Sequence, residues 1–235
     1  MTVLAFVLVP MALALLPFFQ FFRGTPHQLA AVKQLEESLP EGVLDEDAEW
    51  FEAWKASGIE QQVWAPYYHQ LDNKTGRGYR ECFSSAAAMV AAFHRRVSSD
   101  DMYIRIREAY GDTTSVSAQV TALRTLGLDV DFLQDANAAL VEEELAAGRP
   151  VMVAWYHRGD LSKGEMPIGG HWSLLVGYNQ DEWIMHDPMG RPDLEKGGHN
   201  SRRSGAYVRV SRPAFHQRWQ ADGPSTGWAI VVHDG

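Results

Sequence analysis

Cysteine is almost absent from this chain of 235 residues, in which Cys82 is the only one. A single cysteine excludes any disulfide within the chain, so stability must come from the hydrophobic core. Basic residues are also scarce, because 21 Lys and Arg against 30 Asp and Glu give a formal net charge of -9. The pairs Arg95-Arg96 and Arg202-Arg203 are too short to form a basic patch. This balance argues against nucleic acid as a partner, since a phosphate backbone would be repelled.

Charged and polar side chains are missing from Val3 to Phe19, and Arg23 is the first charged residue of the chain. A helix of this length matches the thickness of the hydrocarbon core of a bilayer. A signal peptide usually begins with basic residues, and Met1-Thr2 carries none. We therefore expect residues 1–23 to form an uncleaved membrane anchor. Export of the protein is the alternative, if the segment is cleaved.

Two further segments follow from the change in composition along the chain. Residues 24–60 carry an acidic stretch and Trp50, Phe51 and Trp54 at helical spacing, which predicts short helices that connect the anchor to the remainder. Residues 61–235 have the composition of one compact domain, in which helical patterns come first and strand patterns later. This segregation predicts an α+β fold whose helical part packs on a mainly antiparallel sheet.

The helices and strands of this domain can be placed from periodicity and from capping residues. Four helices are expected, and Ser99, Ser115 and Asp135 are polar residues suited to cap the last three. These helices cover residues 82–96, 99–110, 115–126 and 135–147. Apolar runs rich in β-branched and aromatic residues predict six strands. The strands cover residues 128–133, 151–156, 171–178, 183–186, 206–210 and 228–233.

Cys82 follows a glycine-containing loop and begins the alanine-rich helix. At the N-terminus of a helix, unpaired backbone N–H groups and the positive end of the macrodipole favour a thiolate, which is the nucleophilic form of cysteine. A solitary cysteine is more often a small buried side chain. A catalytic role for Cys82 therefore requires partners elsewhere in the sequence.

Two strands separated by a short turn supply candidate partners. The first begins at Gly169-Gly170-His171, and the second ends at His186-Asp187. A turn near residues 179–181 pairs the strands antiparallel and brings Asp187 back beside His171. A carboxylate in that place can fix the imidazole tautomer and leave the other ring nitrogen for the thiol. The glycine pair leaves room for a substrate backbone to approach.

The segments that carry these residues resemble the papain-like cysteine peptidases of the bacteriocin-leader-processing, or double-glycine, group. The similarity covers residues 66–190 and includes Gly-Gly-His171-Trp and His-Asp187-Pro. It implies four catalytic roles: nucleophile for Cys82, general base and acid for His171, orienting acid for Asp187 and side-chain oxyanion donor for Gln70. We expect the substrate to contact Gly169, Gly170 and Trp172.

Simpler interpretations of the same residues remain open. His171 could be an ordinary strand histidine, and Asp187-Pro188 could simply begin a turn. A zinc site built on His186 with His69 or His171 is a further alternative. Successive strand residues point to opposite faces, however, so His186 and Asp187 would not share one ion, and we expect no metal. Other histidines are treated as surface or loop residues without a role: His157, His199, His216 and His233.

The sequence therefore predicts a cysteine hydrolase that cleaves peptide bonds through a thioester acyl-enzyme, without a cofactor. Two alternatives stay open. One is a peptidoglycan amidohydrolase or endopeptidase of the cell envelope, and the other is a catalytically silent, membrane-tethered binding module on the same fold. The expected partners are a peptide or peptidoglycan-peptide substrate and, through residues 1–23, a membrane.

Overall fold

The computed structural model describes residues 61–234, which belong to one compact unit spanning Glu60–Gly235. The membrane anchor expected at residues 1–23 and the connecting helices expected within residues 24–60 lie outside the described residues. Within the described part of the chain, no helix is both long enough and apolar enough to cross a bilayer.

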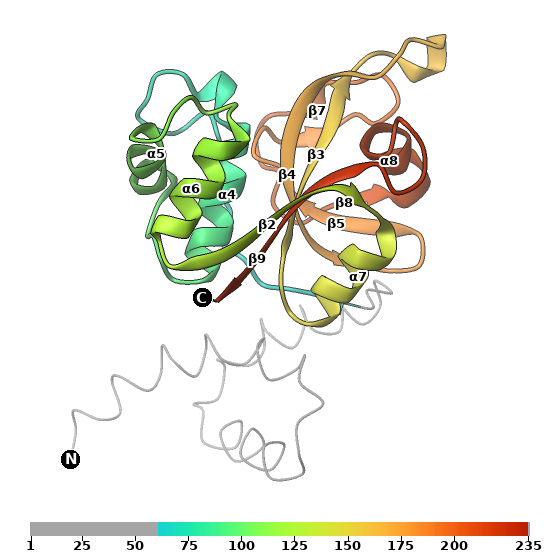
Figure 1. Ribbon diagram of the computed structural model, residues 1–235. Coiled ribbons are helices and arrows are strands. Elements are labelled where there is room, and N and C mark those ends of the chain that lie inside the picture. The colour runs from blue at the N-terminus through green and yellow to red at the C-terminus, as the bar shows by residue number, and fades with distance from the viewer. Residues whose placement is uncertain (1–60, 235) are drawn as a thin grey trace, which may run out of the picture. The chain divides into compact units, whose positions relative to one another are not determined.

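Three of the predicted helices lie together beside the sheet (Figure 1). Ser99 and Ser115 cap two of them as expected, because their side chains accept hydrogen bonds from the backbone N–H groups of Met102 and Ala118. Residues 83–91 of the first helix are all buried, since small and apolar side chains surround its axis. The bounds are Cys82–Phe93 for α4, Asp100–Glu108 for α5 and Val116–Thr125 for α6.

All six predicted strands are present, and they pair antiparallel throughout. The main path of the seven-stranded sheet has the order β2-β9-β3-β4-β5-β8, and β1 pairs with β4. Their bounds are Gln61–Gln62 for β1, Leu128–Ala136 for β2, Val151–Arg158 for β3, Ile168–Tyr178 for β4, Glu182–His186 for β5, Val208–Ser211 for β8 and Gly227–Asp234 for β9. The predicted α+β class with a mainly antiparallel sheet is confirmed.

One predicted helix cap is wrong, and several short elements differ from the expected ones. Asp135 lies within β2, and Asn137 caps the fourth helix by accepting a hydrogen bond from the N–H of Leu140. Both residue types are good caps, so composition alone did not decide between them. The fourth helix is α7, Ala138–Ala146. The unpredicted elements are β1, already described, η1 Gly78–Arg80, η2 Leu161–Lys163, β6 Arg191–Pro192, β7 His199–Ser201 and α8 Arg212–Trp219.

Helices cover both faces of the sheet, because side chains alternate along each strand (Figure 1). On β3, Trp155 and its alternate neighbours join a core that includes α7 and α8. The opposite face of β4 receives α4, where Phe83 stacks on Trp172 with ring centroids 3.9 Å apart. This contact places Cys82, the residue before Phe83, beside the strand that carries His171.

The hairpin of β4 and β5 has the predicted turn. A backbone hydrogen bond of 3.0 Å closes it across Asn179–Glu182. The strand register pairs Leu174 with His186. The next residue along the chain, Asp187, therefore returns to the start of β4, where His171 lies.

Candidate active site

Cys82 and His171 line the same pocket, which has a volume of about 430 Å³. Cys82 is the first residue of α4. Its backbone N–H therefore has no acceptor within the helix. The pocket thus combines a thiol, an imidazole and a backbone donor that could stabilise an oxyanion.

A buried ion pair fixes the backbone just before the thiol. The carboxylate of Glu81 lies 3.2 Å from the guanidinium of Arg107 on α5, and both side chains are almost inaccessible. The hydroxyl of Thr113 donates to the same carboxylate at 2.8 Å. Because the loss of either charged partner would leave the other buried and unpaired, this contact strongly constrains the start of α4.

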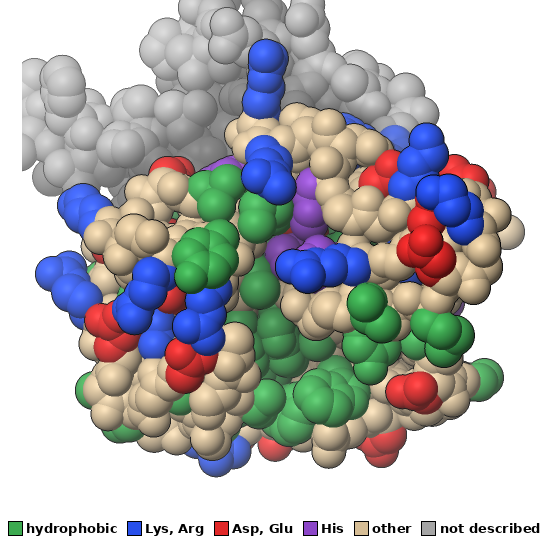
Figure 2. Space-filling view, turned by 90° about the horizontal axis from the view of Figure 1, so that it is seen from above, with side chains coloured by type: hydrophobic (Ala, Val, Ile, Leu, Met, Phe, Trp, Pro, Cys, Tyr) green, Lys and Arg blue, Asp and Glu red, His purple; other side chains and the backbone are tan. Residues whose placement is uncertain are grey.

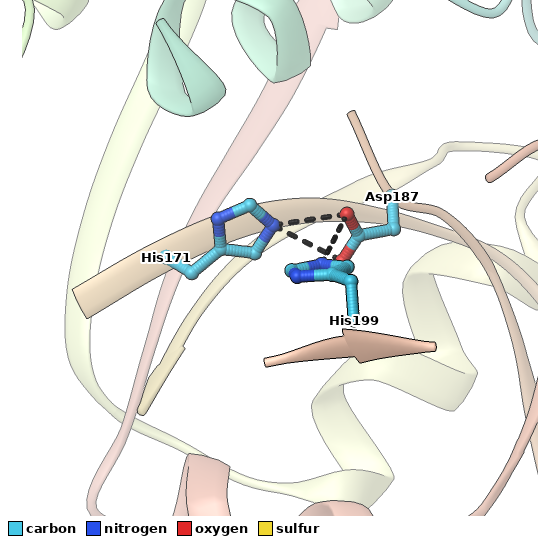
Figure 3. A group of neighbouring side chains, drawn as sticks. All are labelled: His171, Asp187 and His199. Atoms are coloured by element: carbon cyan, nitrogen blue, oxygen red, sulfur yellow. Dashed lines mark hydrogen bonds and ion pairs between the residues drawn. The ribbon is translucent and has the colours of Figure 1, made fainter. Parts of the chain in front are cut away.

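His171 and Asp187 lie side by side, as the hairpin predicts (Figure 3). The Nε2 atom of His171 lies 3.0 Å from each carboxylate oxygen of Asp187. The side chains are 3% and 0% exposed. A carboxylate only accepts hydrogen bonds, so the network assigns a proton to Nε2. The other nitrogen, Nδ1, points away from Asp187 and is left for the thiol.

The opposite charges of His171 and Asp187 shift the pKa of each residue toward its charged form. Burial alone would lower the pKa of His171, but the Asp187 carboxylate and Cys82 outweigh it and raise the pKa to about 10. Burial would likewise raise the pKa of Asp187, yet His171 and His199 hold it well below its usual range. At neutral pH the pair is therefore an imidazolium and a carboxylate.

A second histidine contacts the same carboxylate. The Nε2 atom of His199, on β7, lies 3.0 Å from Oδ1 of Asp187, and its ring centroid is 5.1 Å from that of His171. His157 also lines the pocket, 5.2 Å from His171 between ring centroids. Burial, with a contribution from His171, lowers the pKa of His157 to about 4. The expectation that His157 and His199 are surface or loop residues is wrong, because both lie on strands and contact the ring of His171.

The sequence does contain a signal for the second histidine. His199 follows Gly197-Gly198, so the Gly-Gly-His pattern of residues 169–171 occurs twice. Strand β7 is only three residues long, and its partner β6 is two. Strands this short leave no readable alternation, and the repeated motif was the only sequence feature that could have linked His199 to the site.

Gln70 lies at the pocket but is partly engaged elsewhere. Its side chain is buried and lines the pocket with Cys82. The Nε2 atom donates to the carbonyl of Gly78 at 2.8 Å, and the backbone N–H donates to the carbonyl of Pro188 at 2.9 Å. An amide nitrogen has two N–H groups, and this bond uses one of them. The oxyanion role of Gln70 stays a prediction.

The three expected substrate contacts differ in position. Gly170 lines the pocket, and a Cβ atom there would meet nothing within 4 Å. Gly169 has a φ of +74°, a conformation that favours glycine, and lies against the side chains of His157 and Arg158. Trp172 is 8% exposed and stacks on Phe83. Its position corrects the expectation, because this ring packs α4 on β4 instead of facing the pocket.

The predicted zinc alternative does not match the observed arrangement. His186 is buried against Tyr207, with ring centroids 4.4 Å apart. Within residues 61–234, the possible metal ligands that do converge are His171, Asp187 and His199, whose ligand atoms lie within 4.8 Å of one another. The hydrogen bonds to the carboxylate use these same atoms, so a metal ion would have to displace them.

Three peptidases are among the solved structures that resemble the chain. A protein of Bacillus anthracis described as a C39-like peptidase is 16% identical with a TM-score of 0.52, and the match covers 75% of this chain and 98% of that chain. A double-glycine-motif protease from an AMS/PCAT transporter, in complex with the leader peptide, is 16% identical with a TM-score of 0.46, covering 75% and 96%. The peptidase domain of Streptococcus ComA is 20% identical with a TM-score of 0.45, covering 67% and 93%. The first of these matches shows that the fold is shared.

Sequence comparison tests family membership, which structural similarity at this level of identity does not establish. No curated protein matches the chain. The model of the Peptidase_C39 like family matches residues 63–226, which is more than half of the chain and contains Cys82, His171 and Asp187. The chain therefore belongs to the Peptidase_C39 like family and is a cysteine peptidase with a papain-like fold.

Proposed function

We propose that this peptidase cleaves peptide bonds with Cys82 as nucleophile, His171 as general base and acid, and Asp187 as the residue that orients His171. The main support is the contact of His171 Nε2 with both oxygens of Asp187 at 3.0 Å, together with the pocket that His171 and Cys82 both line. The imidazolium beside the thiol favours the thiolate, which attacks carbonyl carbon.

The proposed reaction has two stages. The Cys82 thiolate forms a bond to the carbonyl carbon of the scissile peptide, and the resulting oxyanion is held by the backbone N–H of Cys82 with Gln70. His171 then donates its Nδ1 proton to the leaving amine, and the C–N bond breaks to give a thioester. In the second stage His171 accepts a proton from water as the water attacks the thioester. The C–S bond then breaks, which releases the acid product and restores the Cys82 thiolate beside the His171 imidazolium.

The single cysteine allows a direct test of this proposal. Stepwise alkylation of the full chain with a thiol-directed electrophile should abolish peptide hydrolysis in proportion to the fraction of Cys82 that mass spectrometry finds modified. One adduct per chain should correspond to complete loss. Hydrolysis that survives complete alkylation of Cys82 would contradict the proposed nucleophile.

The pocket also predicts a preference for substrate charge. Arg80, Arg158 and Arg202 line it, and no Asp or Glu among the described residues does. Arg80 is paired with Asp112 at 3.0 Å, so the other two arginines carry most of the effect. Figure 2 shows Lys and Arg side chains beside the histidines, in a hollow of this face. We expect a peptide with glutamate near the scissile bond to be cleaved about tenfold faster, by kcat/KM, than its lysine counterpart.

Matched peptides that differ only in glutamate, glutamine or lysine would measure this preference. It should weaken at high salt and in Arg158→Gln and Arg202→Gln variants, because screening and charge removal act on the same attraction. Equal rates for all three peptides at low salt would rule the preference out.

A further inference from the structure

We propose that His199 is a positioning residue of the active site, which holds the Asp187 carboxylate in the orientation that His171 requires. This inference rests on the proposed triad and adds a fourth residue to it. The proposed role of His199 is exerted through Asp187 and involves no contact with the thiol.

The acceptor positions of the Asp187 carboxylate are filled by fixed donors. Oδ1 accepts from His199 at 3.0 Å and from the backbone N–H of Met189 at 2.8 Å. Oδ2 accepts from the hydroxyl of Ser173 at 3.0 Å, and His171 lies 3.0 Å from both oxygens. An ionised carboxylate offers about four lone-pair sites. Asp187 is 0% exposed, so these donors replace the water that burial has removed.

Residues 194–199 form a well-anchored segment that places His199 at this position. The segment lies against the end of β3, where the N–H of Gly198 donates to the carbonyl of His157 at 2.6 Å. Gly197 and Gly198 have φ values of +80° and +79°. A Cβ atom on Gly197 would lie 3.0 Å from the carbonyl oxygen of Gly159, so the close approach requires glycine. The side chain of His199 is only 5% exposed.

The two histidines use the same nitrogen toward the shared carboxylate. Figure 3 shows the imidazoles of His171 and His199 reaching Asp187 from different strands, each through Nε2. His199 must therefore carry a proton on Nε2. This donor fixes the orientation of the carboxylate. That is the property expected of a positioning residue.

A matched pair of variants tests the role. His199→Gln places an amide donor near the position of Nε2, whereas His199→Met has a similar length and no donor. In the full chain, we expect His199→Met to lower kcat by about 10- to 100-fold with little change in KM, and His199→Gln to stay within about threefold of wild type. Thermal unfolding of both variants shows whether a difference in folding contributes.

The pH dependence of hydrolysis distinguishes a positioning role of His199 from a role in packing alone. The donors from His171 and His199 keep Asp187 ionised, while Tyr67, which also faces it, stays neutral because burial raises its pKa to about 12. Loss of the His199 donor raises the pKa of Asp187. On acidification, His199→Met should therefore lose activity at a higher pH than wild type or His199→Gln does.

The outcomes separate this inference from the proposed triad. If His171→Ala leaves hydrolysis unchanged, the triad itself fails. If His171→Ala abolishes hydrolysis while His199→Met matches wild type in kcat and in its acid limb, the positioning role alone fails. Nitrogen-15 NMR of the wild-type imidazoles provides a check without substitution, and a neutral His199 protonated on Nδ1 instead of Nε2 would overturn the inference.

Discussion

Replacing His171 with glutamine should lower peptide hydrolysis by about 10³- to 10⁴-fold while the protein stays folded. The glutamine amide can still donate to Asp187, and that carboxylate keeps its bonds from Ser173, Met189 and His199. Asp187 loses its cationic partner, but these hydrogen-bond donors still satisfy the carboxylate, so the variant should fold with a lower free energy of unfolding than wild type. What the variant lacks is a nitrogen that can take and return a proton. The ratio kcat/KM, with thermal unfolding as a check on folding, measures the effect.

The pH dependence follows from the raised pKa of His171. The imidazolium is the proton donor for the leaving amine, and it is present below its pKa of about 10. Wild-type hydrolysis should therefore fall as the pH rises through about 10. In His171→Gln, the thiol has no neighbouring imidazolium to favour the thiolate. Alkylation of Cys82 at neutral pH should therefore be about tenfold slower than in wild type.

His233→Gln is the control for the substitution itself, since that histidine lies on β9 and does not line the pocket. It should match wild type in hydrolysis and in alkylation. A His171→Gln variant that keeps more than a tenth of the wild-type kcat/KM would show that another group performs the proton transfer.

The part of the site that the sequence predicts is the part built from local pairing. His171 and Asp187 are sixteen residues apart, and one hairpin with a recognisable turn brings them together. The start of α4 is equally local, because an apolar helix of alanines begins directly at Cys82. Fold class follows from the same patterns, since helices and strands with clear periodicity occupy separate parts of the chain.

The contacts that the sequence does not predict join short or irregular segments. His199 reaches Asp187 through a three-residue strand, which has no usable period. Trp172 follows His171 in a motif that suggests substrate contact, yet its ring stacks on Phe83. Arg218 belongs to a helix that the periodicity did not indicate, and its partners are backbone carbonyls. A carbonyl carries no side-chain identity, so no sequence pattern can reveal such a contact.

Replacing Arg218 with methionine should destabilise the protein by about 3–5 kcal/mol, the largest stability effect that we expect from a single residue outside the core. The guanidinium is fully buried, and its five N–H groups donate to five carbonyls at 2.7–3.2 Å. Those carbonyls belong to residues 156, 158 and 159 at the end of β3 and to residues 194 and 195 before β7. Methionine has no donor, so all five acceptors would lose this partner.

Arg218→Lys should also be strongly destabilising, because an ammonium has three donors and lacks the planar fork that reaches two segments at once. The matched control is Arg203→Met, an exposed position where little change is expected. Chemical denaturation gives the free energies of unfolding, and a loss of about 3–5 kcal/mol should appear as a fall in Tm of about 10 °C. Because Arg218 anchors the segment that delivers His199, any folded Arg218→Lys protein should also show the raised acid limb expected of His199→Met. A folded, fully active variant with a wild-type acid limb would mean that residues 194–199 hold their position without this anchor.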